Sequence, residues 1–454
     1  MTLHPGYGVM RRFLLAAALL GFAAGPAAAT SIERVVSPGG IEAWLVRETS
    51  VPVVALDFAI QGGANEDPAD KAGLAHMVAS LIDEGAGDLT ADAYHQRLED
   101  NAIELSFSAN RDHFRGSLRT LSANRDLAFD MLRLSLTAPR FDDEAVERIR
   151  TQILADRRRA TTSPNEIASD LWWRTAFAGH PYSRLVHGTL ESIPHIGVAD
   201  LTAYTRRVFA RSTLRIAVVG DIDAATTGAL IDKAFGALPE KPELAPVPAA
   251  TPQGLGRRVV VDLDVPQAVI MFGGEGVARN DPDFFAAYLV NHILGGGAMS
   301  SRLYREVREK RGLAYGIYTG LSSLGHTALI TGSTATRADR TADTLDIIAQ
   351  EMRRLAETGP TEEELAKTKS FLKGSYGLYF DTSSKIAAQL VQIQLDNLGI
   401  DYINKRNDLI EAVTPADAQR VARHLLDGKM LVTVVGRPQG VTSQEASGPP
   451  GSGG

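Results

Sequence analysis

An alternating pattern of apolar and polar residues occurs twice in the chain, in two similar stretches. The first stretch, VPVVALDFAIQGGANEDP, begins at Val51, and the second, VPQAVIMFGGEGVARNDP, begins at Val265. Because successive side chains of a strand point to opposite faces, the alternation predicts strands over 53–60 and 267–272. A second pair of similar segments ends in Val-Val-Gly at Gly220 and again at Gly436, with nearly the same separation. Agreement at both ends indicates two homologous domains rather than short repeats.

The elements that follow these strands are also the same in the two halves. Runs of apolar residues predict a helix over 70–83 and another over 282–294, and a hairpin comes next in each half. Amphipathic helices follow, one of them opened by the capping box of Thr361 and Glu364, and a final strand ends at each Val-Val-Gly. The sequence therefore predicts an α+β fold of two homologous domains, each a mostly antiparallel sheet with helices packed on one face.

The two ends of the chain and its centre differ from this pattern. Residues 1–29 contain paired arginines, a short apolar run and a small-residue cleavage site, which is typical of a secretory signal peptide and places the protein in the periplasm. A membrane-anchored helix is the alternative, but the run is short for a bilayer. The proline-rich segment 238–256 predicts a linker between an N-terminal domain, 30–237, and a C-terminal domain, 257–438. Residues 439–454, rich in Gly, Pro and Ser, are expected to be disordered.

Composition excludes some classes of function and of site. The formal net charge is −7, and Lys and Arg are scattered without a basic stripe, so nothing indicates nucleic-acid binding. The chain has no cysteine, and an exported protein of this sequence therefore has no disulfide bond and no thiolate metal site.

The segment GLAHMVASLIDEGAG, residues 73–87, contains part of a metal-binding pattern. Two histidines four residues apart on a helix share a face and can bind one zinc ion, and a glutamate beside them can deprotonate the metal-bound water. In the order His-x-x-Glu-His this arrangement is the inverzincin signature. Only the first histidine of that signature is present here.

Several features in order resemble the pitrilysin/insulysin (insulinase) family of inverzincin zinc peptidases. They are the segment 73–87, the duplicated halves, HPYSRLVHGT at 180–189, and GGGAMSSRLYREVREKRGLAYGIY at 295–318. The resemblance covers residues 32–438 and extends to the subunits of the mitochondrial processing peptidase. It implies the pitrilysin/insulysin fold.

The chain departs from this family at the metal site. The slot keeps His76, but Ala79 replaces the catalytic glutamate and Ser80 replaces the second histidine. The distal glutamate ligand of the family aligns with Asp156. One histidine and one aspartate make a poor zinc site, and no carboxylate at position 79 can activate water. We therefore expect no intact catalytic site and no metal in this chain, with zinc bound instead by a partner subunit.

The resemblance implies a second site in the C-terminal domain. In two-part members of the family, the half without zinc supplies an arginine and, seven residues later, a tyrosine that contact the substrate backbone. In this chain they are Arg308 and Tyr315, in VREKRGLAY. SSRLYREVREK predicts a helix, Gly312 permits its turn, and AYGIYTGL predicts a strand, so that both side chains can point into one cleft. From the residues alone, Arg308 could instead belong to a solvated charge run and Tyr315 to the core.

Together these features imply the non-catalytic, substrate-binding subunit of a heterodimeric periplasmic zinc metalloendopeptidase that degrades or processes peptides. The expected partner is a homologous, zinc-binding catalytic subunit. No nucleic acid and, after removal of the signal peptide, no membrane span is expected. Two alternatives stay open. One is a non-enzymatic scaffold or peptide-binding subunit, and the other is a self-sufficient zinc peptidase with an unusual metal site.

Overall fold

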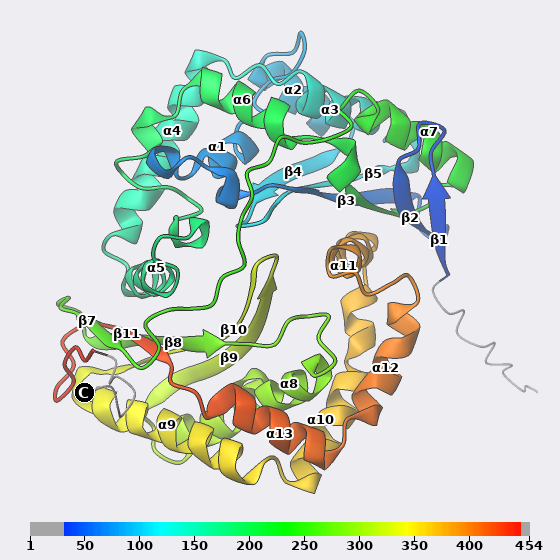
Figure 1. Ribbon diagram of the computed structural model, residues 1–454. Coiled ribbons are helices and arrows are strands. Elements are labelled where there is room, and N and C mark those ends of the chain that lie inside the picture. Colours follow the sequence, from blue (N-terminus) through cyan, green and yellow to red (C-terminus); the bar gives the residue numbers. More distant parts are fainter. Residues whose placement is uncertain (1–30, 446–454) are drawn as a thin grey trace, which may run out of the picture.

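The computed structural model describes residues 31–445, which form two halves of similar construction that face each other (Figure 1). The N-terminal half contains a six-stranded sheet in the order β1-β2-β6-β3-β5-β4, and the C-terminal half a five-stranded sheet in the order β7-β11-β8-β10-β9. Neighbouring strands are antiparallel except for one parallel pair in each sheet, β2 with β6 and β7 with β11. The predicted α+β class is confirmed.

The described strands correspond closely between the halves. Their bounds are β1 Ile32–Val36, β2 Glu42–Arg47, β3 Val53–Gln61, β4 Glu104–Ala109, β5 His113–Leu121, β6 Arg215–Gly220, β7 Arg258–Val261, β8 Gln267–Glu275, β9 Ala314–Leu324, β10 Thr327–Arg337 and β11 Leu431–Val435. The main helices are α1 Leu74–Ala79, α2 Ala91–Asp100, α3 Arg125–Thr137, α4 Asp143–Ala160, α5 Pro164–Ala176, α6 Val198–Val208, α7 Ala224–Phe235, α8 Phe284–Asn291, α9 Thr341–Thr358, α10 Glu362–Gly374, α11 Ser383–Leu395, α12 Tyr402–Ala412 and α13 Pro415–Leu426.

The strands and helices predicted from local sequence patterns are present in the structure, with small differences in where they begin and end. The strands predicted over 53–60 and 267–272 are β3 and β8. The helix predicted over 70–83 is shorter, because α1 begins only after Gly73, whose φ of +96° is left-handed, and ends at Ala79. In the second half, α8 continues into a π-helical turn over His292–Gly296. The predicted capping box opens α10, since the Thr361 hydroxyl accepts from the Glu364 amide at 3.2 Å and the Glu364 carboxylate from the Thr361 amide at 2.9 Å.

Most helices of each half pack on one face of that half's sheet, whereas α5 and α11 each cover the opposite face of the other half's sheet. On the N-terminal sheet, Leu390 and Val391 of α11 pack against Ala59 and Val219. The Gln394 side chain of α11 also donates to the carbonyl oxygen of Ile216 at 3.0 Å. Burying these apolar side chains is a main source of stability for the contact between the halves.

The two halves exchange one helix each. As α11 of the C-terminal half covers the N-terminal sheet, α5 of the N-terminal half covers the C-terminal sheet. The Trp172 indole N–H donates to the Leu431 carbonyl at 3.2 Å, and the Thr433 hydroxyl donates to the Ala168 carbonyl at 3.0 Å. The two exchanged helices are equivalent in the repeat, since the separation of their first residues is close to that of the repeated strands β3 and β8. In Figure 1, α5 lies at the left and α11 at the right of the space between the sheets.

A third contact joins the halves through the β9–β10 hairpin. The carboxylate of Asp112, which is buried, accepts the Tyr182 hydroxyl at 2.5 Å and the Gly325 amide at the tip of the hairpin at 2.9 Å. The Tyr182 hydroxyl in turn accepts the His326 amide at 3.1 Å. The hairpin tip is therefore fixed to the N-terminal half by hydrogen bonds to one buried charged network.

The remaining segments complete the chain. Residues 238–256 contain no helix or strand and run along the outside of both halves. Gln444 pairs with Arg258 through two backbone hydrogen bonds of 2.8 Å, so the described beginning of the tail, 439–445, is ordered against β7, contrary to the expected disorder. The predicted signal peptide and residues 446–454 lie outside the described residues. Within residues 31–445, none of the helices combines the length and apolar character needed to cross a bilayer.

Candidate functional site

The helix α1 is held at both ends. The carboxylate of Asp67 accepts the amides of Gly73 at 2.8 Å and Ala75 at 2.9 Å, which satisfies donors at the start of the helix. At the other end, the Ser80 hydroxyl donates to the His76 carbonyl at 2.9 Å, a local bond that competes with continuation of the helix. His76 is thereby fixed in place, while the Ser80 side chain is engaged with backbone.

The imidazole of His76 faces a second histidine, His187, which the sequence analysis did not identify as a site residue. Their ring centroids are 4.5 Å apart, with the rings nearly perpendicular. Burial, followed by the charges of His187 and Arg157, lowers the pKa of His76 to about 4, and burial also lowers the pKa of His187. Both imidazoles are therefore neutral near pH 7.

The helix α4 turns an arginine, not an aspartate, toward this pair. Its buried face is made by Ile149, Ile153 and Arg157, spaced by four residues. The Arg157 guanidinium forms an ion pair with Asp170 of α5 at 2.7 Å, and its charge contributes to the low pKa of His76. Asp156 lies on the solvent face of α4, where its half-exposed carboxylate pairs with Arg159. The structure therefore does not bring Asp156 to His76, as the alignment with the metal ligand had implied.

These residues do not fit a zinc ion. A catalytic zinc site uses three protein ligands, each of them an imidazole, a carboxylate or a thiolate, and keeps a position for water. At this place the chain offers two imidazoles, the methyl group of Ala79, a hydroxyl bound to backbone, and a buried guanidinium whose charge disfavours a divalent cation. The carboxylates of Asp170 and Glu166 act on His187, but Asp170 is already engaged with Arg157. Throughout residues 31–445, no three His, Asp or Glu side chains form a group that could hold a metal ion.

The structure brings Arg308 and Tyr315 together in the C-terminal half. Arg308 lies in a π-helical segment, Tyr304–Glu309, and Gly312, with a φ of +59°, turns the chain into β9. The guanidinium carbon of Arg308 lies 4.3 Å from the centroid of the Tyr315 ring and 5.0 Å from that of Tyr304. Stacking on two rings restricts the guanidinium while leaving its N–H groups available at its edge. Tyr304 is a supporting residue that the sequence analysis missed.

The charge run around Arg308 leaves this one guanidinium without a carboxylate. Glu306 is buried and binds both Lys310 and Arg311 at 2.6 Å. Within residues 31–445, the Arg308 guanidinium forms no ion pair and no side-chain hydrogen bond. Its interactions there are the cation–π contacts with the rings of Tyr304 and Tyr315. Tyr315 is 83% exposed, which rules out the alternative that it belongs to the core.

The arrangement at this position is a pair of hydrogen-bond donors that converge without a counter-ion. A guanidinium only donates, and a phenol hydroxyl can donate as well, so the pair is suited to carbonyl or carboxylate oxygens. Both groups lie beside β9, the edge strand of its sheet. The site can thus hold polar atoms of an extended chain, but within residues 31–445 no group of His, Asp or Glu beside it could hold a metal ion for cleaving one.

Comparisons with known proteins agree with this picture. The family described as "Insulinase (Peptidase family M16)" matches residues 44–190, and "Peptidase M16 inactive domain" matches 195–372. The chain is similar to an uncharacterized zinc protease of Streptomyces coelicolor, with 28% identity over 89% of this chain and 90% of the relative. It is also similar to a protein of Helicobacter pylori named a non-peptidase homolog, with 26% identity over 83% of this chain and 86% of that protein.

Two further comparisons concern assembly and fold. A probable mitochondrial-processing peptidase subunit beta of Schizosaccharomyces pombe is 27% identical over 87% of this chain and 88% of its own length. A crystal structure described as a peptidase M16 inactive domain from Pseudomonas fluorescens superposes with a TM-score of 0.84 at 27% identity, covering 90% of this chain and 98% of that one. The names of these relatives thus include both peptidases and proteins that are not peptidases.

Proposed function

Because the chain belongs to the insulinase family, peptidase family M16, we propose that it is the non-catalytic, substrate-binding subunit of a heterodimeric periplasmic zinc metalloendopeptidase that acts on peptides. The observation that carries this proposal is the contrast between its two halves. The N-terminal half has Ala79, Ser80 and a buried Arg157 at the metal position. The C-terminal half presents a half-buried Arg308 without a counter-ion and, stacked beside it, an exposed Tyr315.

The proposed role of the pair is to hold and polarise a peptide that the partner cleaves. The Tyr315 hydroxyl donates a hydrogen bond to the carbonyl oxygen of the bond being cut, where negative charge develops. Arg308 donates to a neighbouring carbonyl and so positions the chain. The zinc ion and the general base belong to the partner, because this chain supplies neither.

Two features support the proposed assembly and location. This chain lacks the Glu and the second His of the His-x-x-Glu-His motif, so in the proposed assembly a second, homologous subunit supplies the intact motif. The segment 1–29 has the pattern of a signal peptide, which supports export to the periplasm.

The decisive experiment is to recover the tagged chain from its native periplasm and to test it alone and with its co-purified partner. Alone, the chain is expected to contain no stoichiometric zinc and to cleave no peptide, as measured by elemental analysis and a fluorogenic peptide assay. With a partner of similar length, zinc and chelator-sensitive cleavage should appear together. One zinc per isolated chain with turnover would instead establish a self-sufficient peptidase.

The non-enzymatic alternative has one observation in its favour, since a relative that matches most of this chain is named a non-peptidase homolog. It expects that the chain forms only inactive assemblies, with no zinc-bearing partner. Recovery of a homodimer that stays inactive after every periplasmic fraction has been added would support this alternative and exclude the proposed subunit role.

A further inference from the structure

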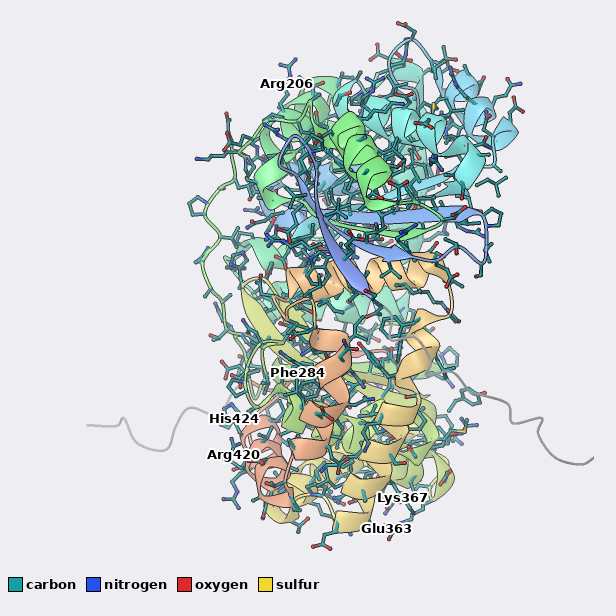
Figure 2. The ribbon with its side chains drawn as sticks, turned by 90° about the vertical axis from the view of Figure 1, so that its right-hand side faces the viewer. Arg206, Phe284, Glu363, Lys367, Arg420 and His424 are labelled. Carbon is teal, nitrogen blue, oxygen red and sulfur yellow. The ribbon has the colours of Figure 1, made fainter. Side chains whose placement is uncertain are left out.

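A second concave site lies away from Arg308 and Tyr315, where α8, α11, α12 and the 3-10 turn Tyr376–Phe380 meet. It is a cavity of about 250 Å³ whose walls are largely aromatic. Phe284 and Tyr288 of α8 stack nearly parallel, with centroids 6.0 Å apart, on one side of it. In Figure 2, Phe284 lies in the upper part of the C-terminal half, below the N-terminal half. A cavity of this size holds one side chain and its terminal group, since sites for drug-sized ligands reach about 300–1,000 Å³.

Two arginines line this cavity, and in the described chain neither forms a close ion pair with a carboxylate, although Arg279 feels the charge of Asp396. The Arg279 guanidinium carbon lies 4.1 Å from the Phe284 ring centroid and 4.9 Å from that of Tyr402, and its Nη2 donates to the Tyr402 hydroxyl. Arg406 is only 5% exposed, and its guanidinium carbon lies 3.9 Å from the Tyr376 centroid. Among residues 31–445, no carboxylate forms an ion pair with either side chain.

A buried arginine without a counter-ion is unusual, because transferring a charge out of water is costly unless it is paired. The Nη1 atom of Arg406 donates to the Leu372 carbonyl at 3.1 Å and to the Asn407 side chain at 3.3 Å, and its guanidinium also hydrogen-bonds the Tyr288 hydroxyl. All of these partners are neutral, so none of them balances its charge. An anion entering the cavity would lower this cost further. Tyrosine hydroxyls add neutral donors, since burial raises the pKa of Tyr288, and that of Tyr376 to about 12.

One carboxylate, Asp396, also lines the cavity and opposes an anion. Burial raises the pKa of Asp396, while a hydrogen bond from Gln392 and the charges of Arg279 and Arg115 oppose that shift. Asp396 forms no ion pair with Arg279 or Arg406, so two cations face at most one negative charge. The cavity therefore keeps an excess of positive charge within aromatic walls.

From this geometry we propose that the cavity binds a carboxylate attached to an apolar group, the chemistry of the C-terminal residue of a peptide. The guanidinium groups of Arg279 and Arg406 bind the carboxylate. The rings of Phe284, Tyr288 and Tyr376 pack on the apolar side chain. For the source of the ligand this inference rests on the proposed peptide-binding function, because a free aromatic acid has the same two parts.

The test is calorimetric titration of the full-length chain, without a partner and without cleavage. The probes are N-acetyl-Ala-Phe with a free carboxylate, the same dipeptide as its amide, and 3-phenylpropionate. The free acid should bind at least about tenfold more tightly than the amide, since losing a hydrogen bond to a charged group costs roughly ten- to hundredfold. Equal affinities for acid and amide would overturn the proposal without any variant.

Variants locate the binding in this cavity. Arg279→Gln should weaken binding of the acid roughly ten- to hundredfold, whereas Asp396→Asn should strengthen it by removing the opposing charge. Arg337→Gln is the matched control, because that arginine pairs with Asp339 on the surface away from the cavity. Unchanged affinity in a folded Arg279→Gln variant would overturn the site, and binding of 3-phenylpropionate alone would overturn a peptide source. These results do not depend on Arg308, Tyr315 or a zinc partner, so failure here is distinguishable from failure of the proposed function.

Discussion

Replacing Tyr315 with phenylalanine removes one hydroxyl and little else. Because the Tyr315 side chain is 83% exposed, its hydroxyl contributes no buried hydrogen bond within the chain, and the ring stays beside the Arg308 guanidinium at 4.3 Å. The stacking between cation and ring, about 0.5–1 kcal/mol at an exposed site, is therefore retained. Folding and assembly of the Tyr315→Phe variant should match those of the unmodified chain within about 0.5 kcal/mol.

The effect on turnover distinguishes two roles of the hydroxyl. If it donates to the developing oxyanion in a site closed by the partner, kcat in the reconstituted pair should fall by ~10²–10³-fold, the effect of losing one such donor. That loss corresponds to roughly 2.7–4 kcal/mol of transition-state stabilisation. If the hydroxyl only contacts substrate in a water-filled site, a neutral hydrogen bond of about 0.5–1.5 kcal/mol predicts a loss of roughly two- to twelvefold, seen mainly in KM.

The assay is steady-state cleavage of a fluorogenic peptide by the pair, with zinc content measured in parallel. Tyr318→Phe is the matched control, because Tyr318 lies on the same strand, is 63% exposed and is not one of the two rings that stack on Arg308. It should leave kcat and KM unchanged. Wild-type kcat and KM in both Tyr315→Phe and Arg308→Ala, with the partner's zinc retained, would refute the assignment of the pair to substrate.

Three further predictions concern the rest of the molecule. Asp112→Ala removes the acceptor that joins Tyr182 to the hairpin tip at Gly325. It should lower the free energy of unfolding by about 2–3 kcal/mol and increase amide exchange at 325–326. Asp339→Ala, at an exposed ion pair, should lower it by under about 0.5 kcal/mol, and equal effects of the two variants would contradict the buried network. The pKa of His76 is lowered in the folded chain to about 4, so folding stability is highest above pH ~6.5 and falls by up to ~3 kcal/mol as the pH drops toward 4. His76→Gln should therefore reduce the dependence of the denaturant midpoint on pH over this range, whereas the exposed His424→Gln should leave it unchanged. An unchanged pH profile in His76→Gln would contradict this assignment. The double variant Ala79→Glu with Ser80→His should not bind one zinc per chain in elemental analysis, because Arg157 faces the site and Asp156 does not. Adding Arg157→Glu should raise the zinc occupancy. Full occupancy in the double variant would contradict the repulsion by Arg157.

Signals that act over a few residues were readable in the sequence. The capping box at Thr361 and the alternating strands β3 and β8 depend on hydrogen bonds and side-chain periodicity that neighbouring residues determine. The pairing of Arg308 with Tyr315 was implied by the family resemblance, and the helix, glycine turn and strand that connect them over a short stretch of chain are compatible with it. The Arg308 guanidinium lacks a carboxylate partner because Glu306 binds Lys310 and Arg311 instead, and the charge run alone does not determine which of these side chains Glu306 contacts.

What the sequence did not provide depends on helix phase and on distant contacts. Alignment by spacing placed Asp156 at the ligand position, but the buried positions Ile149 and Ile153 on α4 put Arg157, four residues further, on the inner face. That periodicity was available in the sequence and would have identified Arg157. The placement of α5 and α11 on the opposite sheets was not available, because no local pattern identifies the sheet on which an amphipathic helix packs.

The reciprocal placement of these two helices has a consequence for the origin of the chain. A single half of this architecture, on its own, leaves one sheet face uncovered and one helix without a surface to pack on. Two copies of such a half would cover both faces by lending each other the helix, which is a symmetric domain-swapped dimer. Joining the copies through a linker makes that exchange intramolecular and independent of concentration, and it allows the two halves to diverge. The two halves of this chain differ in this way, with Ala79 and Ser80 at one site and Arg308 and Tyr315 at the other, which is the kind of specialisation that such a fusion permits.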